Sequence, residues 1–273
     1  MSNQSKADVQ RHYGRLNKLF WMGVLGIVLG PVLMLVVAAI AFKIAGSNVS
    51  APIGLCSPFA AVAAIALALM VRSSRRIARR SLEKAKFAES VGYQYLWKPT
   101  SEETQMLQEM SLWDNPTSFV VTNLICTEQD GVDIQIADVR SEHFYGAATA
   151  WSEQTVLMFP DAVSDEFELR IMPKGRADKM LGKLVNYGAD QRFSKLPLAA
   201  NYHIGCEGNI DMSALFECLT ALTPLFQKNP QLCLAAENGN LILFSEMKLL
   251  SAPEIRPMLA TSWTALQAFS RLN

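Results

Sequence analysis

The sequence predicts an α+β protein in which an N-terminal hairpin of two transmembrane helices precedes a soluble domain with a mainly antiparallel sheet and late amphipathic helices. Two observations support this class. Two long uncharged runs lie within the first 71 residues, and in the remaining chain strand-like segments are grouped before helix-like ones. Half of the 273 residues are hydrophobic, which suffices for a membrane anchor and one ordinary domain.

The two uncharged runs have the length of membrane-spanning helices. Residues 20–42 form a run of 23 and residues 51–71 a run of 21, which correspond to roughly 34 and 31 Å of helix, against a hydrocarbon core of about 30 Å. A cleaved signal peptide is the competing interpretation of the first run, but its apolar core normally has only about 7 to 15 residues. Only Lys43 lies between the runs, whereas Lys and Arg flank both outer ends. Because basic loops stay in the cytoplasm, we expect a multi-pass protein of a bacterial inner (cytoplasmic) membrane with both termini, including residues 1–19, in the cytoplasm.

Small residues recur four positions apart in both runs, a spacing that lets helix backbones approach closely in lipid. They are Gly26 and Gly30 in the first run and Ala60, Ala64 and Ala68 in the second. The pattern predicts packing within the hairpin, with homodimerisation through the transmembrane helices as the alternative.

The segment VRSSRRIARRSLEKAK follows the second run directly. Residues 1–86 carry 12 Lys or Arg and two acids, a net charge of +10, while residues 87–273 carry 13 and 23, a net charge of −10. Residues 72–92 are therefore expected to form a basic juxtamembrane helix that stops at Gly92 and contacts anionic lipid head groups. The contacting side chains are expected to be Arg72, Arg75, Arg76, Arg79 and Arg80. Nucleic acid is not expected as a partner, because the acidic domain repels phosphates.

Residues 93–273 are expected to form the cytoplasmic acidic α+β domain. The predicted elements are a short helix capped by Ser101, strands in 118–126, 132–140, 149–159 and 166–172, a helix in 176–188, a strand in 198–208, a helix capped by Asp211, two strands around Asn238 and Gly239, and a final helix begun by Pro253. Pro224 and Pro257 are expected to bend or interrupt the last two helices.

A membrane hairpin followed by VGYQYLWKP, FELRIMPKG, RFSKLPLAANYHIGCEG and NGNLILF resembles uncharacterised bacterial inner-membrane proteins of the domain-of-unknown-function type. The resemblance implies a location and an N-terminal hairpin with a cytoplasmic α+β domain. It implies no activity.

Chemistry-bearing residues come together in YHIGCEG, where Cys206, His203 and Glu207 are candidates for a nucleophile, its base and an orienting group. In an extended segment, however, His203 and Cys206 point to opposite faces. No metal-ligand spacing and no phosphate-binding glycine loop occurs in the sequence, so neither a metal nor another cofactor is expected.

The sequence thus favours a membrane-anchored binding or scaffolding module, with a lipid bilayer and another protein as partners. A membrane-bound hydrolase that uses Cys206 with His203 is the alternative. A lipid-sensing domain resembling pleckstrin-homology-like barrels is a further one.

Overall fold

A computed structural model describes most of the chain after residue 49. The described residues are 7, 8, 10, 11, 14, 15, 18, 50–110, 113, 116–145, 148–174, 191–245 and 247–270, without the side chains of 50–64, 66–68, 71 and 143–150. The chain divides into two compact units. One comprises Asn3–Glu83, and the other comprises Lys84–Asn273 together with the first two residues.

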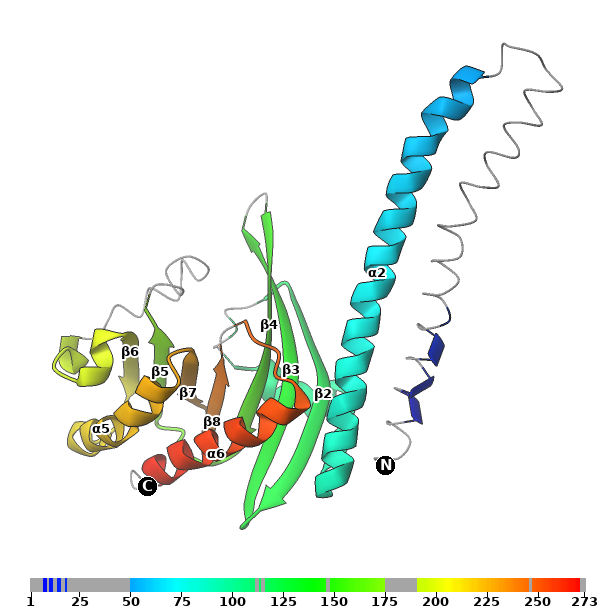
Figure 1. Cartoon of the computed structure of the whole chain (residues 1–273). Helices are drawn as coiled ribbons and strands as arrows, with labels where there is room; N and C mark the ends of the chain where they lie inside the picture. The colour runs from blue at the N-terminus through cyan, green and yellow to red at the C-terminus, as the bar shows by residue number, and fades with distance from the viewer. Residues whose placement is uncertain are drawn as a thin grey trace. The chain divides into compact units, whose positions relative to one another are not determined.

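Eight strands of the described chain form one sheet in the larger unit (Figure 1). Its order is β1-β2-β3-β4-β8-β7-β5-β6, and every pairing is antiparallel. The strands are β1 (Gln94–Leu96), β2 (Ser118–Gln129), β3 (Val132–Tyr145), β4 (Ala148–Phe159), β5 (Phe167–Pro173), β6 (Tyr202–Gly208), β7 (Leu232–Glu237) and β8 (Asn240–Ser245).

Two tight turns set the register of neighbouring strands. Asp130 and Gly131 join β2 to β3 with φ values of 53° and 77°, and Asn238 and Gly239 join β7 to β8 with 51° and 78°. Positive φ at both central residues gives the turn the right-handed twist of the strands that it connects. Both predicted hairpins are confirmed.

Four helices and two short 3-10 turns have defined bounds in the described chain, beside the helical residues described between 7 and 18. The helices are α2 (Ser50–Val91), α3 (Ser101–Gln108), α5 (Met212–Lys228) and α6 (Ala252–Phe269), and the turns are η4 (Gln191–Phe193) and η5 (Pro197–Ala200). Asp211 caps α5 as predicted, because its carboxylate accepts the Ser213 N–H at 2.8 Å. The predicted cap of α3 is one residue too late, since Thr100 forms the capping box with Glu103. Pro224 and Pro257 lie inside helices that continue past them.

The sheet has helices on both faces. Aromatic contacts attach α6 and α5 to one face, with ring centroids 6.0 Å apart for Phe159 and Trp263 and 5.0 Å apart for Tyr202 and Phe226. On the opposite face, Leu107 of α3 and the nearby Trp113 join a buried apolar cluster with residues of β2, β3, β4, β7 and β8. Burial on both faces explains why the central strands β7 and β8 are apolar almost throughout.

The predicted transmembrane hairpin is the part of the fold class that needs correction. Within the ranges that the structure describes, no helix combines the length and the apolar character that crossing a membrane requires. Residues 51–71 belong to the 42-residue helix α2, which continues without a break into the basic segment that begins at Arg72. The expected multi-pass placement in a bacterial inner membrane, with both termini cytoplasmic, is corrected on the same finding.

Several predictions fall outside the described residues. The first expected span at 20–42, with Gly26 and Gly30, lies there, as do the helix expected at 176–188 and the side chains of Ala60, Ala64 and Ala68. By contrast, the predicted stop of the basic helix at Gly92 is confirmed, because α2 ends at Val91 and Gly92 has a φ of 78°.

Gly208 at the end of β6 provides a test of how closely the backbone there approaches Glu166 and Phe167. Its φ is 93°, and a Cβ there would clash with the Glu166 carbonyl oxygen and lie 2.7 Å from the Phe167 Cα. We expect Gly208→Ala to lower the free energy of unfolding by about 3 kcal/mol, through backbone strain and overpacking. Urea denaturation measures the loss. In the matched variant Gly131→Ala the new Cβ meets nothing within 4 Å, so only the positive φ of 77° costs stability, about 1 kcal/mol. Equal losses in both variants would contradict the close approach at Gly208.

Candidate functional site

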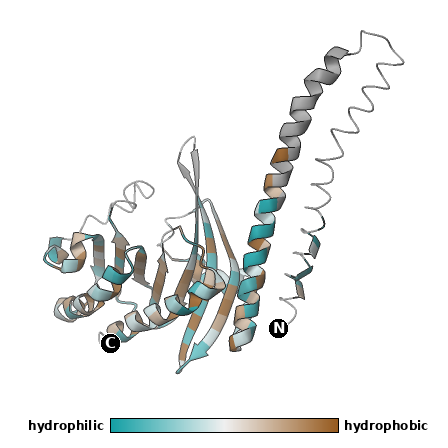
Figure 2. Ribbon diagram, in the orientation of Figure 1, coloured by the Kyte–Doolittle hydropathy of each residue, from teal (hydrophilic) through white to brown (hydrophobic). Residues whose placement is uncertain are grey.

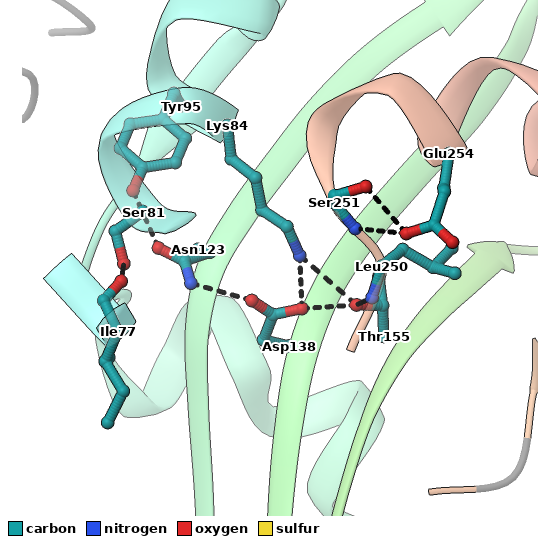
Figure 3. A network of polar contacts seen from close by, with 10 residues as sticks. All are labelled: Ile77, Ser81, Lys84, Tyr95, Asn123, Asp138, Thr155, Leu250, Ser251 and Glu254. Carbon is teal, nitrogen blue, oxygen red and sulfur yellow. Dashed lines mark hydrogen bonds and ion pairs between the residues drawn. The ribbon is translucent and has the colours of Figure 1, made fainter. Parts of the chain in front are cut away.

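A buried ion pair joins the end of α2 to the middle of the sheet (Figure 3). Lys84 on α2 is 1% exposed and Asp138 on β3 is 7% exposed. The Lys84 Nζ donates to Asp138 Oδ1 at 2.5 Å and lies 3.2 Å from the Thr155 hydroxyl on β4. A helix and two strands therefore meet at one pair of opposite charges.

Further hydrogen bonds satisfy the rest of the Asp138 carboxylate. Its Oδ1 also accepts the Thr155 hydroxyl at 2.5 Å, and its Oδ2 accepts the Asn123 amide at 2.7 Å. Asn123 sits at the bulge of β2 with a φ of 54°, and its side-chain oxygen accepts the Tyr95 hydroxyl at 2.7 Å. Asn tolerates this left-handed conformation better than most residues. The bulge thus places a β2 side chain within reach of the ion pair.

The start of α6 is tied to the same network. The Leu250 N–H donates to the Thr155 hydroxyl oxygen at 2.8 Å. One residue later, Ser251 donates to the Glu254 carboxylate from its N–H at 2.8 Å and from its hydroxyl at 2.6 Å. Side-chain hydrogen bonding from Lys248, 2.8 Å away, and then from Ser251 lowers the pKa of Glu254 from 4.5 to about 2. The network therefore extends from α2 through three strands to the N-terminus of α6.

This arrangement suits a structural anchor better than a reacting centre. Moving two charged groups out of water costs free energy. A buried pair is tolerated where its geometry is good and its remaining lone pairs accept hydrogen bonds. Both carboxylate oxygens of Asp138 accept hydrogen bonds, and both charged side chains are hidden from solvent. The pair therefore fixes the orientation of α2 residues from Lys84 onward on the sheet.

The arginines of α2 present an exposed basic surface in the smaller unit. Arg72, Arg76, Arg79 and Arg80 are exposed and Arg75 is partly so. Figure 2 shows the hydrophilic colouring of this part of the helix. The side chains of Ile65, Leu69, Met70 and Ile77 are 58, 59, 66 and 53% exposed. Large apolar side chains thus adjoin guanidinium groups on one described helix, which we call the basic–apolar surface of α2.

The residues predicted from YHIGCEG do not share one face. All three lie on β6, where alternation places His203 and Glu207 on one face and Cys206 on the other. Cys206 is buried, and its carbonyl oxygen accepts the Arg192 guanidinium at 2.7 Å. The proposed use of Cys206 with His203 in hydrolysis stays a prediction.

Carboxylates gather around Arg170 on the face that carries Glu207. Glu168 is the cross-strand partner of Glu207, and the Arg170 Nη2 lies 3.8 Å from Glu168 and 3.3 Å from the buried Glu237. Burial first and then the charge of Glu237 raise the pKa of Glu168, while Arg170 opposes the shift. Among the residues that the structure describes, no three His, Cys, Asp or Glu side chains converge to hold a metal ion. This cluster is an ion-pair group within the sheet.

Sequence reasoning missed Lys84 and Asp138 as a pair, because 54 positions separate them. One signal was present. Asp138 continues the alternation of Ile134 and Ile136, so a carboxylate occupies a position where the strand pattern calls for a buried apolar side chain. A buried acid requires a partner. The pattern therefore predicts that a partner exists but not which residue supplies it.

Removing one charge of the Lys84–Asp138 pair should lower the free energy of unfolding far more than removing both. Lys84→Met leaves the Asp138 carboxylate buried without its cation, so we expect the free energy of unfolding to fall by about 3 to 5 kcal/mol. In the double variant Lys84→Met with Asp138→Leu, much of that loss should be recovered, because no isolated charge remains. Denaturant unfolding of the two single variants, the double variant and the unchanged protein gives the coupling energy. Additive losses would show that the two groups do not interact.

The carboxylate of Glu254 gives a prediction about pH. Because its pKa in the folded state is lowered to about 2, it stabilises the fold above its ordinary pKa of 4.5, and this contribution is lost as the pH falls from 4.5 toward 2. Glu254→Gln should therefore cost about 1 kcal/mol at neutral pH, as loss of a helix cap does. It should cost little near pH 2. Thermal unfolding across this pH range measures the difference, and a cost that does not change with pH would contradict the assignment.

Comparison with known proteins gives no family for this chain. No protein-family model matches it, and no curated protein matches it either. Among solved structures it is similar to the mycobacterial trehalose monomycolate transport factor A, TtfA, with 12% sequence identity and a TM-score of 0.49 over 71% of this chain and 96% of that one. A likeness at this level assigns neither a family nor an activity to the chain.

Proposed function

We propose that this protein is a binding module that attaches to the surface of an anionic membrane through the basic–apolar surface of α2. In this proposal the helix lies on the lipid head groups and does not cross the bilayer. The observation that carries the proposal is the exposure of several guanidinium groups and several large apolar side chains next to one another on one helix.

Helical spacing places Ile65, Leu69 and most of these arginines on a common stripe. Met70 and Ile77 lie outside this stripe, on another side of the helix. Leu69 follows Ile65 by four residues, and Arg72 follows Leu69 by three. Arg76 and then Arg79 and Arg80 continue the same three- and four-residue steps. Residues at these spacings lie above one another on a helix surface. The stripe therefore runs from apolar to basic along α2.

A charged head-group region beside acyl chains is the environment that such a stripe matches. Each Lys or Arg near an anionic leaflet contributes about 1 kcal/mol of attraction, and each apolar side chain that enters the interface adds to it. Nucleic acid would satisfy the guanidinium groups, but it offers no comparable partner for four exposed apolar side chains. The combination favours lipid over nucleic acid. The protein partner expected from the sequence stays a prediction.

Neutralising part of the stripe should weaken vesicle binding. We expect Arg76→Gln with Arg80→Gln to remove about 2 kcal/mol of attraction, or about 30-fold in affinity for phosphatidylcholine vesicles that contain phosphatidylglycerol. Co-sedimentation of the full-length chain with vesicles measures this. Lys195→Gln with Lys228→Gln, which removes the same charge from exposed positions of the larger unit, is the matched control and should bind like the unchanged protein.

Lipid composition, salt concentration and one apolar substitution each test the proposed membrane attachment. Binding of the unchanged protein should need phosphatidylglycerol and should weaken as salt is added, because exposed charges are screened. Leu69→Ser should weaken binding even at low salt, because it removes apolar surface and leaves the charge unchanged. Tighter binding to duplex DNA than to anionic vesicles, or equal binding by the arginine variant and its control, would contradict the proposal.

A further inference from the structure

One cavity of the larger unit shares no lining residue with the ion-pair network. It has a volume of about 630 Å³ and is lined where the ends of β5, β6 and α5 meet the turn η5. Its lining includes Pro173, Lys174, Leu198, Tyr202, Phe226 and Gln227. Small-molecule sites in proteins have volumes of about 300 to 1,000 Å³. The cavity is therefore large enough for a small ligand.

The cavity wall is held in place by hydrogen bonds. The Tyr202 hydroxyl lies 3.3 Å from the Phe226 carbonyl oxygen and 3.2 Å from that of Asn229, which ties β6 to the end of α5. Burial, and then the neighbouring Cys233, raises the pKa of Tyr202 to about 12, so the hydroxyl stays protonated at neutral pH. On the other side, the Lys174 N–H donates to the Asn201 carbonyl oxygen at 2.8 Å. The cavity is thus formed before a ligand arrives.

Among the described residues that line the cavity, Lys174 is the one that carries a charge. Its ammonium donates to the Ala199 carbonyl oxygen at 2.5 Å, and an ammonium has three donors. The end of a helix carries partial negative charge. At the end of α5, however, the carbonyl oxygens of Leu225, Phe226 and Asn229 already accept hydrogen bonds. The fixed charge facing a ligand is therefore positive.

Apolar and neutral polar residues line the cavity together with that charge. Pro173, Pro197, Leu198 and Phe226 are apolar, and Asn201, Gln227 and Gln231 have neutral amide side chains. From this combination we infer that the cavity binds a small amphipathic anion, with its anionic head at Lys174 and its apolar body against the prolines and leucine. A carboxylate and a phosphate monoester share this chemistry. This inference does not depend on the proposed membrane attachment.

Isothermal titration of the full-length chain with four probes of equal chain length tests the inference. The probes are octanoate, octyl phosphate, octylammonium and octanol. We expect at least one of the two anions to bind about tenfold more tightly than octylammonium and octanol, since a hydrogen bond to a charged group contributes at least about 1.5 kcal/mol. The stronger anion identifies the preferred head group. Failure of both anions to bind, or equal binding by octylammonium, would overturn the inference.

Substitutions of the lining residues then show whether the probes bind in this cavity. Lys174→Gln should reduce anion affinity about tenfold, and Gln227→Glu, which puts a carboxylate beside Lys174 in the cavity, should also reduce it. Ala200→Trp should reduce binding of every probe by occupying the cavity. Lys228→Gln removes the same charge one residue beyond the lining and should change nothing. Anion binding that survives both Lys174→Gln and Gln227→Glu in folded protein, judged by circular dichroism, would place the probe elsewhere and overturn the inference.

Discussion

The buried pair of Lys84 and Asp138 is the interaction on which the larger unit most depends. It connects residues 54 positions apart, with both charges largely hidden from water. Through Asn123 and Thr155 it also reaches β2, β4 and the start of α6. An apolar contact at this place would tolerate small shifts of the helix, whereas a buried charge must keep its partner within hydrogen-bond distance. The pair therefore specifies the angle and the register at which the end of α2 packs on the sheet.

The basic residues of α2 have two different roles. Lys84 is buried and structural, while the arginines from Arg72 to Arg80 face solvent together with exposed apolar side chains. A cluster of basic residues in a sequence is therefore not one functional unit. One of its last members, Lys84, serves the fold, while its first members remain accessible to a partner. This division explains how one continuous helix could both be held by the sheet and present a surface to lipid.

Local patterns predicted local structure well. The turns at Asp130 and Gly131 and at Asn238 and Gly239, and the Asp211 cap, depend on neighbouring residues and were found where expected. The position of β8 between β4 and β7, and the choice of Lys84 as the partner of Asp138, depend on contacts between distant segments that no local pattern encodes. Hydropathy alone predicted two membrane spans, and the described helices do not support that prediction. In YHIGCEG the strand alternation places Cys206 and His203 on opposite faces, as expected for an extended segment.

Native-state hydrogen exchange of Lys84→Met tests the anchoring role of the ion pair most directly. Amides in residues 84–91 should exchange much faster than in the unchanged protein, because the end of α2 can detach without global unfolding, while amides of β7 and β8 should lose much less protection. Such a pattern would assign the anchoring of the helix to this pair. Unchanged protection in 84–91, or a uniform loss throughout the sheet, would contradict the account.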